Sequence, residues 1–183
     1  VVSWGPPPQA QDRTQSFWGN PDNHKYRPVE GIPELRRALS EKMALENAFV
    51  GLDPERIIVT AGANMAFQSA MLALLDPGDE VILLKPYYFN YEMAVVLAAG
   101  KPIPVKSGKD HQPDLGAIRK ALSSRTRAVV TISPNNPTGA VYPESVLREI
   151  NTLCGERGLY HIHDEAYEYF THDSPYEVVG FSV

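Results

Sequence analysis

The stretch Ser133-Pro134-Asn135-Asn136-Pro137-Thr138-Gly139 decides how this chain must fold. Neither a helix nor a strand can continue through it, because Pro137 fixes its own φ angle and keeps Asn136 extended. Gly139 then permits a turn that other residues resist. The apolar run 128–132 directly before this stretch is typical of a buried strand. The sequence therefore predicts a strand followed, at its carboxyl end, by a stiff polar loop.

A second strand is expected one helix later, at residues 159–163, and it runs into Asp164-Glu165-Ala166-Tyr167. In open α/β sheets, ligands bind outside the carboxyl ends of the strands. The Asn136 amide and the Asp164 carboxylate are both placed at such ends. They are therefore candidates for holding one small molecule.

Apolar runs and helical patterns alternate along most of the chain. The expected strands are 57–60, 81–84, 103–105, 128–132 and 159–163, and the expected helices are 32–49, 63–75, 88–99, 115–122 and 144–154. Strands separated by helices of this length favour right-handed crossovers and parallel pairing. We predict an α/β fold, a three-layer α/β/α arrangement around a mainly parallel sheet, here incomplete. Residues 1–31 are expected to form a loop-like N-terminal arm, and 32–183 part of one large domain.

The composition narrows the class of protein. The 183 residues are 43% hydrophobic and 21% charged, which suits one globular unit with its own core. The net charge of −5, without a basic stripe, disfavours nucleic acid as a partner. The single cysteine, Cys154, favours a reducing compartment. We find no apolar run long enough for a membrane span and no pattern typical of a signal peptide, and expect a cytoplasmic protein without a membrane partner.

The two motifs together resemble a known family. Asn136-Pro137-Thr138-Gly139, followed by a strand that ends in Asp-x-Ala-Tyr, is similar to the fold type I pyridoxal-phosphate (PLP) enzymes, in their class I and II aminotransferase branch. Asn-Pro-Thr-Gly alone would be ordinary turn chemistry; the two motifs together, in this order and at this spacing, are specific. The resemblance implies PLP as cofactor and transfer of an amino group between an amino acid and a 2-oxo acid. It also implies a homodimer with shared active sites.

The resemblance assigns the cofactor phosphate to the turn before helix 63–75. Ala63 and Asn64 would hold the phosphate, and Gly62 would permit its close approach. Free backbone N–H groups at a helix start do form anion sites. The alternative is an ordinary glycine-containing turn between a strand and a helix.

Five further residues are implied by the same resemblance. Asp164 would keep the pyridine nitrogen of the cofactor protonated, and Asn136 and Tyr167 would donate to its phenolic oxygen. Tyr88 would stack on the ring, and Tyr26 would reach the phosphate of the neighbouring subunit. Packing is the alternative role for the three tyrosines, turn geometry for Asn136, and a plain surface acid for Asp164. A tryptophan is typical of aspartate-specific members at the position of Tyr88, so this tyrosine disfavours that subgroup.

The chain departs from the family pattern at the Schiff-base lysine. That lysine is expected downstream of Tyr167, yet residues 168–183 contain none, and Arg157 is the last arginine. We therefore assign no catalytic residue. We interpret the chain as part of the large domain of a longer protein, incomplete for catalysis as written.

Other functions remain open at this stage. A PLP-dependent lyase or a decarboxylating synthase would use the same cofactor-binding residues, and a truncated, inactive homologue would explain the missing lysine. A metal-dependent hydrolase is a further alternative, because His161 and His163 share one face of a strand. Their possible partners would be Cys154, His172 or Asp173, but none stands at a familiar ligand spacing, and we expect no metal site.

Overall fold

The computed structural model describes residues 5–171 of the chain. The strands are β1 (Glu80–Lys85), β2 (Lys101–Lys106), β3 (Thr126–Ile132) and β4 (Tyr160–Asp164). The α-helices are α1 (Pro8–Trp18), α2 (Pro33–Glu46), α3 (Ala63–Leu74), α4 (Phe89–Leu97), α5 (Leu115–Ala121) and α6 (Glu144–Arg157). Short 3-10 turns are η1 (Pro21–His24), η2 (Pro54–Arg56) and η3 (Lys109–His111).

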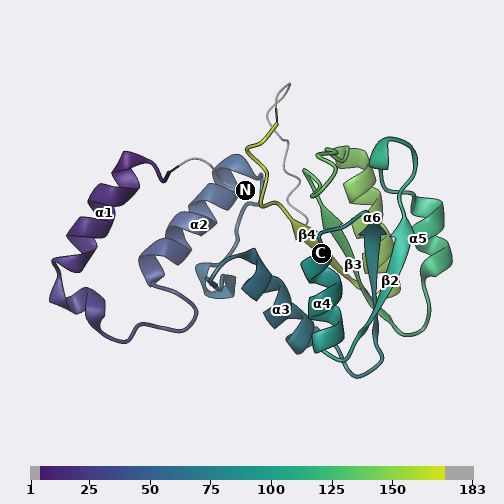
Figure 1. Cartoon of the computed structure of the whole chain (residues 1–183), viewed down its shortest axis with the longest axis horizontal. Helices are drawn as coiled ribbons and strands as arrows, with labels where there is room; N and C mark the ends of the chain where they lie inside the picture. Colours follow the sequence, from purple (N-terminus) through teal and green to yellow (C-terminus); the bar gives the residue numbers. More distant parts are fainter. Residues whose placement is uncertain (1–4, 172–183) are drawn as a thin grey trace.

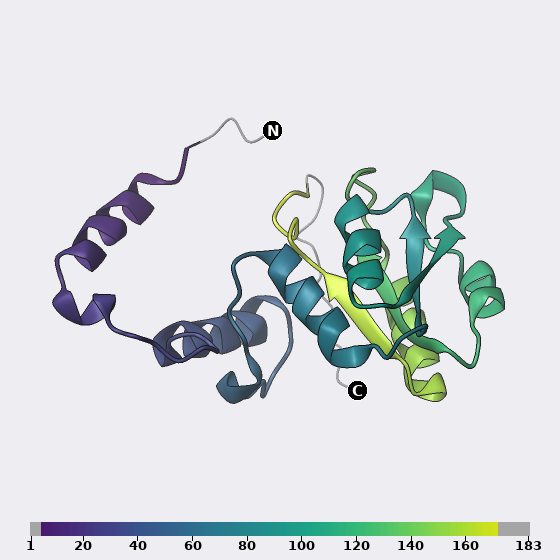
Figure 2. The same cartoon turned by 60° about the horizontal axis from the view of Figure 1, so that its bottom comes forward.

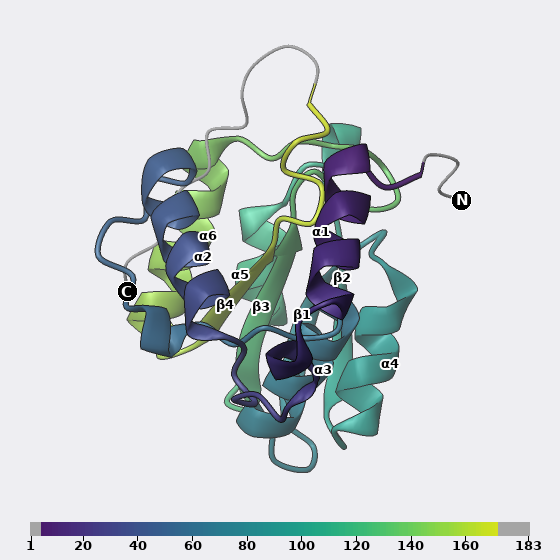
Figure 3. The same ribbon diagram turned by 90° about the vertical axis from the view of Figure 1, so that its left-hand side faces the viewer.

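The four strands form one parallel sheet in the order β2-β1-β3-β4. Figure 3 shows them in this order behind α1 and α2. At the centre of the sheet, Ile82 lies opposite Ile103 of β2 and Val129 of β3. The middle strands carry continuous apolar runs, 81–84 in β1 and 128–130 in β3, as expected where both faces are covered.

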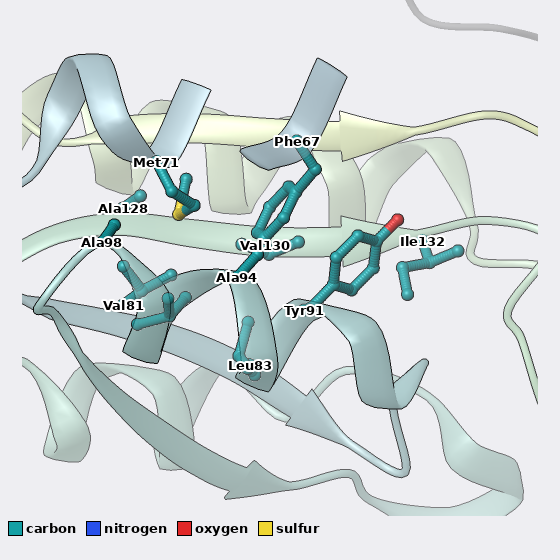
Figure 4. Packing of buried hydrophobic residues seen from close by; sticks show 11 residues of the cluster. Phe67, Met71, Val81, Leu83, Tyr91, Ala94, Ala98, Ala128, Val130 and Ile132 are labelled. Carbon is teal, nitrogen blue, oxygen red and sulfur yellow. The ribbon is translucent and has the colours of Figure 1, made fainter. Parts of the chain in front are cut away.

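The alternation of side chains along the strands builds two separate cores. Val81 and Leu83 face α3 and α4, whereas Ile82 and Leu84 face α5 and α6. The first core, drawn in Figure 4, also contains Phe67, Met71, Tyr91, Ala94, Val95, Ala98, Ala128, Val130 and Ile132. The second also contains Val105, Ile118, Val129, Tyr142, Leu147, Ile150, Leu153 and Cys154. The expected three-layer α/β/α fold with a parallel sheet is therefore confirmed (Figure 1).

This topology creates a place for a ligand. From β1 the chain crosses to β2 at one side, and it later returns to place β3 on the other side of β1. Helices α4 and α6 consequently leave adjacent strands on opposite faces of the sheet. A crevice opens outside the carboxyl ends of the strands at such a switch point. The loops that follow β1, β3 and β4 all meet there.

The expectation that residues 1–31 are loop-like is wrong for Pro8–Trp18, which forms α1. Pro8 occupies the first turn of this helix, where a missing N–H costs nothing and a φ near that of a helix is an advantage. Three consecutive prolines favoured an extended arm, but only Pro6 and Pro7 precede the helix. Gly19 ends it.

The expected strand at 57–60 is also absent from the described sheet. Ile57 has extended angles, and the Val59 N–H donates to the Glu30 carbonyl at 2.9 Å. No described strand lies beside this segment, and the Ile58 side chain is largely exposed. Residues 57–60 have the composition of a strand, but among the described residues no other strand pairs with them through backbone hydrogen bonds.

The N-terminal arm projects from the layered body. Figures 1 and 2 both place α1 beyond α2, well away from the sheet. Neither α1 nor α2 contains a buried residue. Across the part of the chain that the structure describes, we find no helix with the length and apolar character needed to cross a bilayer.

Candidate functional site

A pocket of about 300 Å³ lies at the carboxyl edge of the sheet. Four separate segments contribute to it: the start of α3, the start of α4, the loop after β3, and the end of β4 with its following turn. The lining residues are Ala61, Gly62, Ala63, Asn64, Tyr88, Tyr91, Ile132, Asn136, Asp164, Ala166 and Tyr167. Seven of the eight residues expected from the sequence therefore lie around one cavity.

The start of α3 forms one wall and is suited to an anion. Gly62 precedes the helix with φ +85°, and a Cβ added there would meet no atom within 4 Å on the protein side. No side chain caps this helix, and its first turn contains no acidic residue. The N–H groups of Ala63 and Asn64 therefore keep no acceptor within the helix, and the positive end of α3 faces the pocket.

The loop after β3 is held rigid from inside. The buried Asn135 side chain accepts from the Thr138 hydroxyl at 2.8 Å and donates to the Tyr142 hydroxyl at 3.2 Å. The Gly139 N–H donates to the Asn135 carbonyl at 2.7 Å. This network fixes the turn, so the neighbouring Asn136 is presented to the pocket without needing to pack in the core.

Asp164 ends β4 and points into the same pocket. Its backbone is fixed because the Ser133 N–H donates to the Asp164 carbonyl at 3.1 Å. One side-chain oxygen accepts from the Ala166 N–H at 2.8 Å, and the other accepts from the Tyr91 hydroxyl. A carboxylate has about four acceptor sites, so room remains for a cationic N–H from a ligand.

Tyr91 supports this carboxylate from the first turn of α4. Figure 4 shows its ring beside Phe67 and its hydroxyl directed toward the end of β3 at Ile132. Burial, and secondly the bond to Asp164, raise the pKa of the Tyr91 hydroxyl far above its usual value. Tyr91 therefore keeps its proton and donates, and Asp164 is the acceptor.

Two more tyrosines, Tyr88 and Tyr167, line the pocket from different segments. The Tyr88 hydroxyl accepts from the Asn90 side-chain amide at 2.7 Å, and the Tyr88 ring meets Tyr91 edge-on at 5.8 Å. Tyr167 lies on the turn after β4, and its ring contacts Phe170 edge-on at 5.6 Å. Tyr88 is held by neighbouring rings, whereas Tyr167 depends on the turn that carries it.

Tyr26 is the expected site residue that does not join the others. Its side chain is fully exposed on the N-terminal arm, and it does not line the pocket. An exposed side chain is what a residue reaching into a neighbouring subunit would present, so its role stays a prediction.

Two residues that shape the site, Tyr91 and Asn135, were not predicted from the sequence. Tyr91 lies in an aromatic-rich segment typical of packing, although a buried tyrosine hydroxyl normally needs a partner. Its position three residues after Tyr88, on the inner face of α4, was the available signal. The sequence did not indicate a role for Asn135, because the family motif begins at its neighbour Asn136. The side-chain bonds of Asn135 also lie within the loop and cannot be predicted from spacing.

The two histidines of β4 face away from the pocket and share one threonine. The Thr131 hydroxyl contacts His161 Nε2 at 2.9 Å and His163 Nδ1 at 2.7 Å. Burial lowers the pKa of His161 to about 3 and that of His163 to about 4. Within residues 5–171 no group of three or more possible metal ligands is found, and His172 and Asp173 lie outside the described residues.

Comparison with known proteins agrees with this geometry. The family model for aminotransferase class I and II matches residues 4–181. The chain belongs to the class I and II aminotransferase family. An aspartate/prephenate aminotransferase of Thermus thermophilus is 44% identical over 151 residues, which cover 81% of this chain and 39% of that protein. An aromatic aminotransferase of Arabidopsis thaliana is 37% identical over 178 residues, covering 94% of this chain and 44% of the relative.

Solved structures of this aminotransferase family have the same fold. The Thermus thermophilus aspartate aminotransferase with maleate superposes with a TM-score of 0.89 at 40% identity, over 96% of this chain and 47% of that chain. This chain spans about two fifths of the length of the curated relatives that it matches. The resemblance recognised from two short motifs is thus confirmed at the level of family and fold.

Proposed function

We propose that residues 1–183 contribute the cofactor-binding part of a PLP-dependent aminotransferase, which transfers an amino group between an amino acid and a 2-oxo acid. One observation carries the proposal. Side chains from four separate segments converge on a single pocket, and their donors and acceptors match PLP from its phosphate to its ring nitrogen. PLP, when bound, supplies an electron sink for reactions at the carbon that bears the amino group.

The phosphate end of the pocket is the start of α3. Ala63 and Asn64 would bind the phosphate through backbone N–H groups, assisted by the positive end of the helix. Gly62 leaves open space where a side chain would otherwise stand. The absence of an acidic residue from this first turn removes a charge that would repel an anion.

Asp164 would bind the ring nitrogen and keep it protonated. A carboxylate beside a cationic N–H favours the protonated form of the ring. Tyr91 donates to Asp164 and orients its carboxylate. Asn136 and Tyr167 would donate to the phenolic oxygen, and Tyr88 would cover the face of the ring.

The partner and compartment are proposals of the same kind. Exposed Tyr26 and the unburied helices α1 and α2 are consistent with a homodimer in which the arm completes the neighbouring site. In that arrangement 1–31 is an arm and 32–183 is part of the PLP-binding large domain. The small-molecule partners would be an amino acid and a 2-oxo acid, in the cytoplasm.

The substitution Asp164→Asn tests the cofactor role. It keeps the shape of the side chain and removes its charge, so PLP should bind roughly a hundredfold more weakly. Absorbance titration with PLP measures the affinity. Asp12→Asn, on α1, is the matched control and should bind PLP as the unmodified protein does. Unchanged affinity in Asp164→Asn would overturn the assignment.

The reaction needs a separate assay, because a lyase or a decarboxylating synthase would bind PLP through the same residues. Amino-group transfer should depend on an added 2-oxo acid, whereas release of ammonia or pyruvate without one would identify a lyase. Relatives are named for aspartate, prephenate and aromatic substrates. Oxaloacetate and an aromatic 2-oxo acid are therefore the first acceptors to compare, and they also test the expectation that Tyr88 disfavours aspartate.

A further inference from the structure

A polar cluster joins the C-terminal end of α2 to the turn that carries Tyr167. Lys42 of α2 donates to both carboxylate oxygens of Glu168, at 2.6 and 2.7 Å, and to the Asn47 side-chain oxygen at 2.7 Å. The Asn47 side-chain amide donates to Glu168 Oε2 at 3.0 Å. We call these three residues the Lys42 clamp. Each of its side chains is bonded to the other two.

The clamp is shielded from water, unlike the exposed ion pairs Lys25–Asp22 and Arg37–Glu34. Asn47 is fully buried, and the side chains of Lys42 and Glu168 are 24% and 17% exposed. Burial alone would lower the pKa of Lys42, but the bond to Glu168 and its charge raise it. Exposed ion pairs contribute little, whereas a satisfied and partly buried network holds its members in one geometry.

The clamp acts on a short turn whose other end is tied to the pocket. The Ala166 N–H donates to the Asp164 side chain at 2.8 Å, and the Glu168 N–H donates to the Glu165 carbonyl at 2.9 Å. The Phe170 N–H donates to the Tyr167 carbonyl at 2.8 Å. Tyr167 therefore sits between two anchors, Asp164 before it and Glu168 directly after it.

The Tyr167 side chain has little else to place it. It is 40% exposed, and the Phe170 ring that it contacts is itself largely exposed. Since no buried cluster of residues 5–171 includes this ring, we infer that the position of its hydroxyl follows from the backbone of the turn. The backbone, in turn, is fixed from the α2 side mainly by Glu168, whose carboxylate accepts two bonds from Lys42, and also by the Tyr169 hydroxyl, which donates to Glu46.

We propose that Lys42, Asn47 and Glu168 are positioning residues, which hold the Tyr167 hydroxyl at the site for the phenolic oxygen of PLP. The inference rests on the proposed function for the ligand, while the mechanical link between α2 and the turn stands on its own. Helix α2 would thereby affect cofactor binding although none of its residues lines the pocket.

The first test needs no cofactor. Glu168→Gln keeps the size of the side chain but removes the charge that Lys42 binds. Amide hydrogen exchange in the protein that carries this chain should then be about tenfold faster at Glu168 and Phe170, whose N–H groups close the turn. Glu144→Gln is the matched control, because it breaks the exposed Arg148 pair on α6 and should leave these amides unchanged. Unchanged exchange in Glu168→Gln would overturn the link.

The second test uses PLP itself, followed by absorbance titration. Tyr167→Phe should weaken PLP binding by about tenfold, the loss expected for one hydrogen bond to a charged oxygen. Glu168→Gln should weaken it to a similar extent. The double variant should be no weaker than Tyr167→Phe alone, because both substitutions remove the same bond. Lys42→Met should behave like Glu168→Gln, whereas Lys42→Arg should retain affinity by restoring a charged pair.

The outcomes separate the two proposals. Normal affinity in Glu168→Gln and Lys42→Met, with weakened binding in Tyr167→Phe, overturns the clamp and leaves the proposed function intact. Additive losses in the double variant also overturn it, since the clamp would then act elsewhere. Failure of the unmodified protein to bind PLP, or normal binding by Tyr167→Phe, overturns the cofactor role on which the inference rests.

Discussion

The arm and the body of this molecule form helices for different reasons. In the body, residues 63–164, every helix turns a face toward the sheet, and the strands β1 and β3 are almost entirely buried. Outside the body, neither α1 of the arm nor α2, which follows the arm, buries a residue, and large side chains such as Trp18 and Leu45 are exposed. A helix of the length of α1 is marginal in water without packing. The comparison shows that local signals can start a helix, but burial supplies its stability.

The sharpest way to test this comparison is the same substitution in both regions. Leu83 is 1% exposed in the core between β1 and α4, whereas Leu45 is 86% exposed on α2. Leu83→Ala should lower the free energy of unfolding by about 3 kcal/mol, through lost burial and the cavity left behind. Leu45→Ala should change it by less than about 0.5 kcal/mol.

Urea unfolding followed by circular dichroism measures both values. A loss at Leu45 as large as that at Leu83 would contradict the comparison. It would show that α2 is packed in solution as firmly as the sheet.

The second prediction concerns pH and the buried groups at the end of the body. His161 and His163 have pKa values of about 3 and 4 in the folded protein, against an ordinary value of 6.5. Between pH 6.5 and about 4 the unfolded chain therefore binds protons that the folded protein does not, and stability falls as the pH falls. Glu165 acts in the opposite direction, because burial, and then Glu168, raise its pKa to about 7.

Between pH 6.5 and 4.5 the two histidines outweigh the one carboxylate. The net slope is about 1.4 kcal/mol per pH unit, with stability decreasing toward acid. His161→Gln removes one histidine and should make this slope nearly flat. His24→Gln, an exposed residue of the arm, is the matched control and should leave the slope unchanged. Unfolding measured at several pH values gives both slopes, and a steep slope in His161→Gln would contradict the prediction.

Much of the body could be predicted from the sequence because its signals are local. Residues 128–132 and 81–84 are short apolar runs bounded by turns, and both became central strands. Their order along the chain then placed Asn136 and Asp164 at one sheet edge without any knowledge of distance. The sequence predicted the secondary structure correctly where it depends on residues that are adjacent in the chain.

The rest depends on contacts between distant segments. Residues 57–60 have strand composition, but a strand needs a ladder partner, and the sequence does not say whether one is present. Tyr91 and Asp164 are 73 residues apart, and Lys42 and Glu168 are 126 apart. Neither pair follows from spacing or periodicity, because only the folded topology brings the two side chains together.

The helix caps allow a finer comparison of the two regions. Asp114 caps α5 in the body, where its side chain accepts from the Ala117 N–H at 3.0 Å. Asn20 caps η1 in the arm, where its side chain accepts from the Asp22 N–H at 3.0 Å. Asp114→Ala should lower the free energy of unfolding by about 1 kcal/mol. Asn20→Ala should have no measurable effect on global unfolding, because we expect the unburied arm to unfold separately from the sheet. Equal losses in urea unfolding would show that arm and body form one cooperative unit.

The smallest effect is expected for two exposed ion pairs of the same length. Glu144 and Arg148 on α6 approach to 2.6 Å, as do Asp22 and Lys25 in the arm. Glu144→Gln should cost about 0.3 to 0.5 kcal/mol at low salt, because the pair lies one turn apart on a helix that packs on the sheet. Lys25→Gln should leave global unfolding unchanged, since the pair that it breaks belongs to a segment outside the cooperative unit. Repeating urea unfolding in about 1 M salt, where screening acts over roughly 3 Å, should erase the difference between the two variants. A difference that persists in high salt would mean that the Glu144 side chain contributes through packing along α6 and not through its charge.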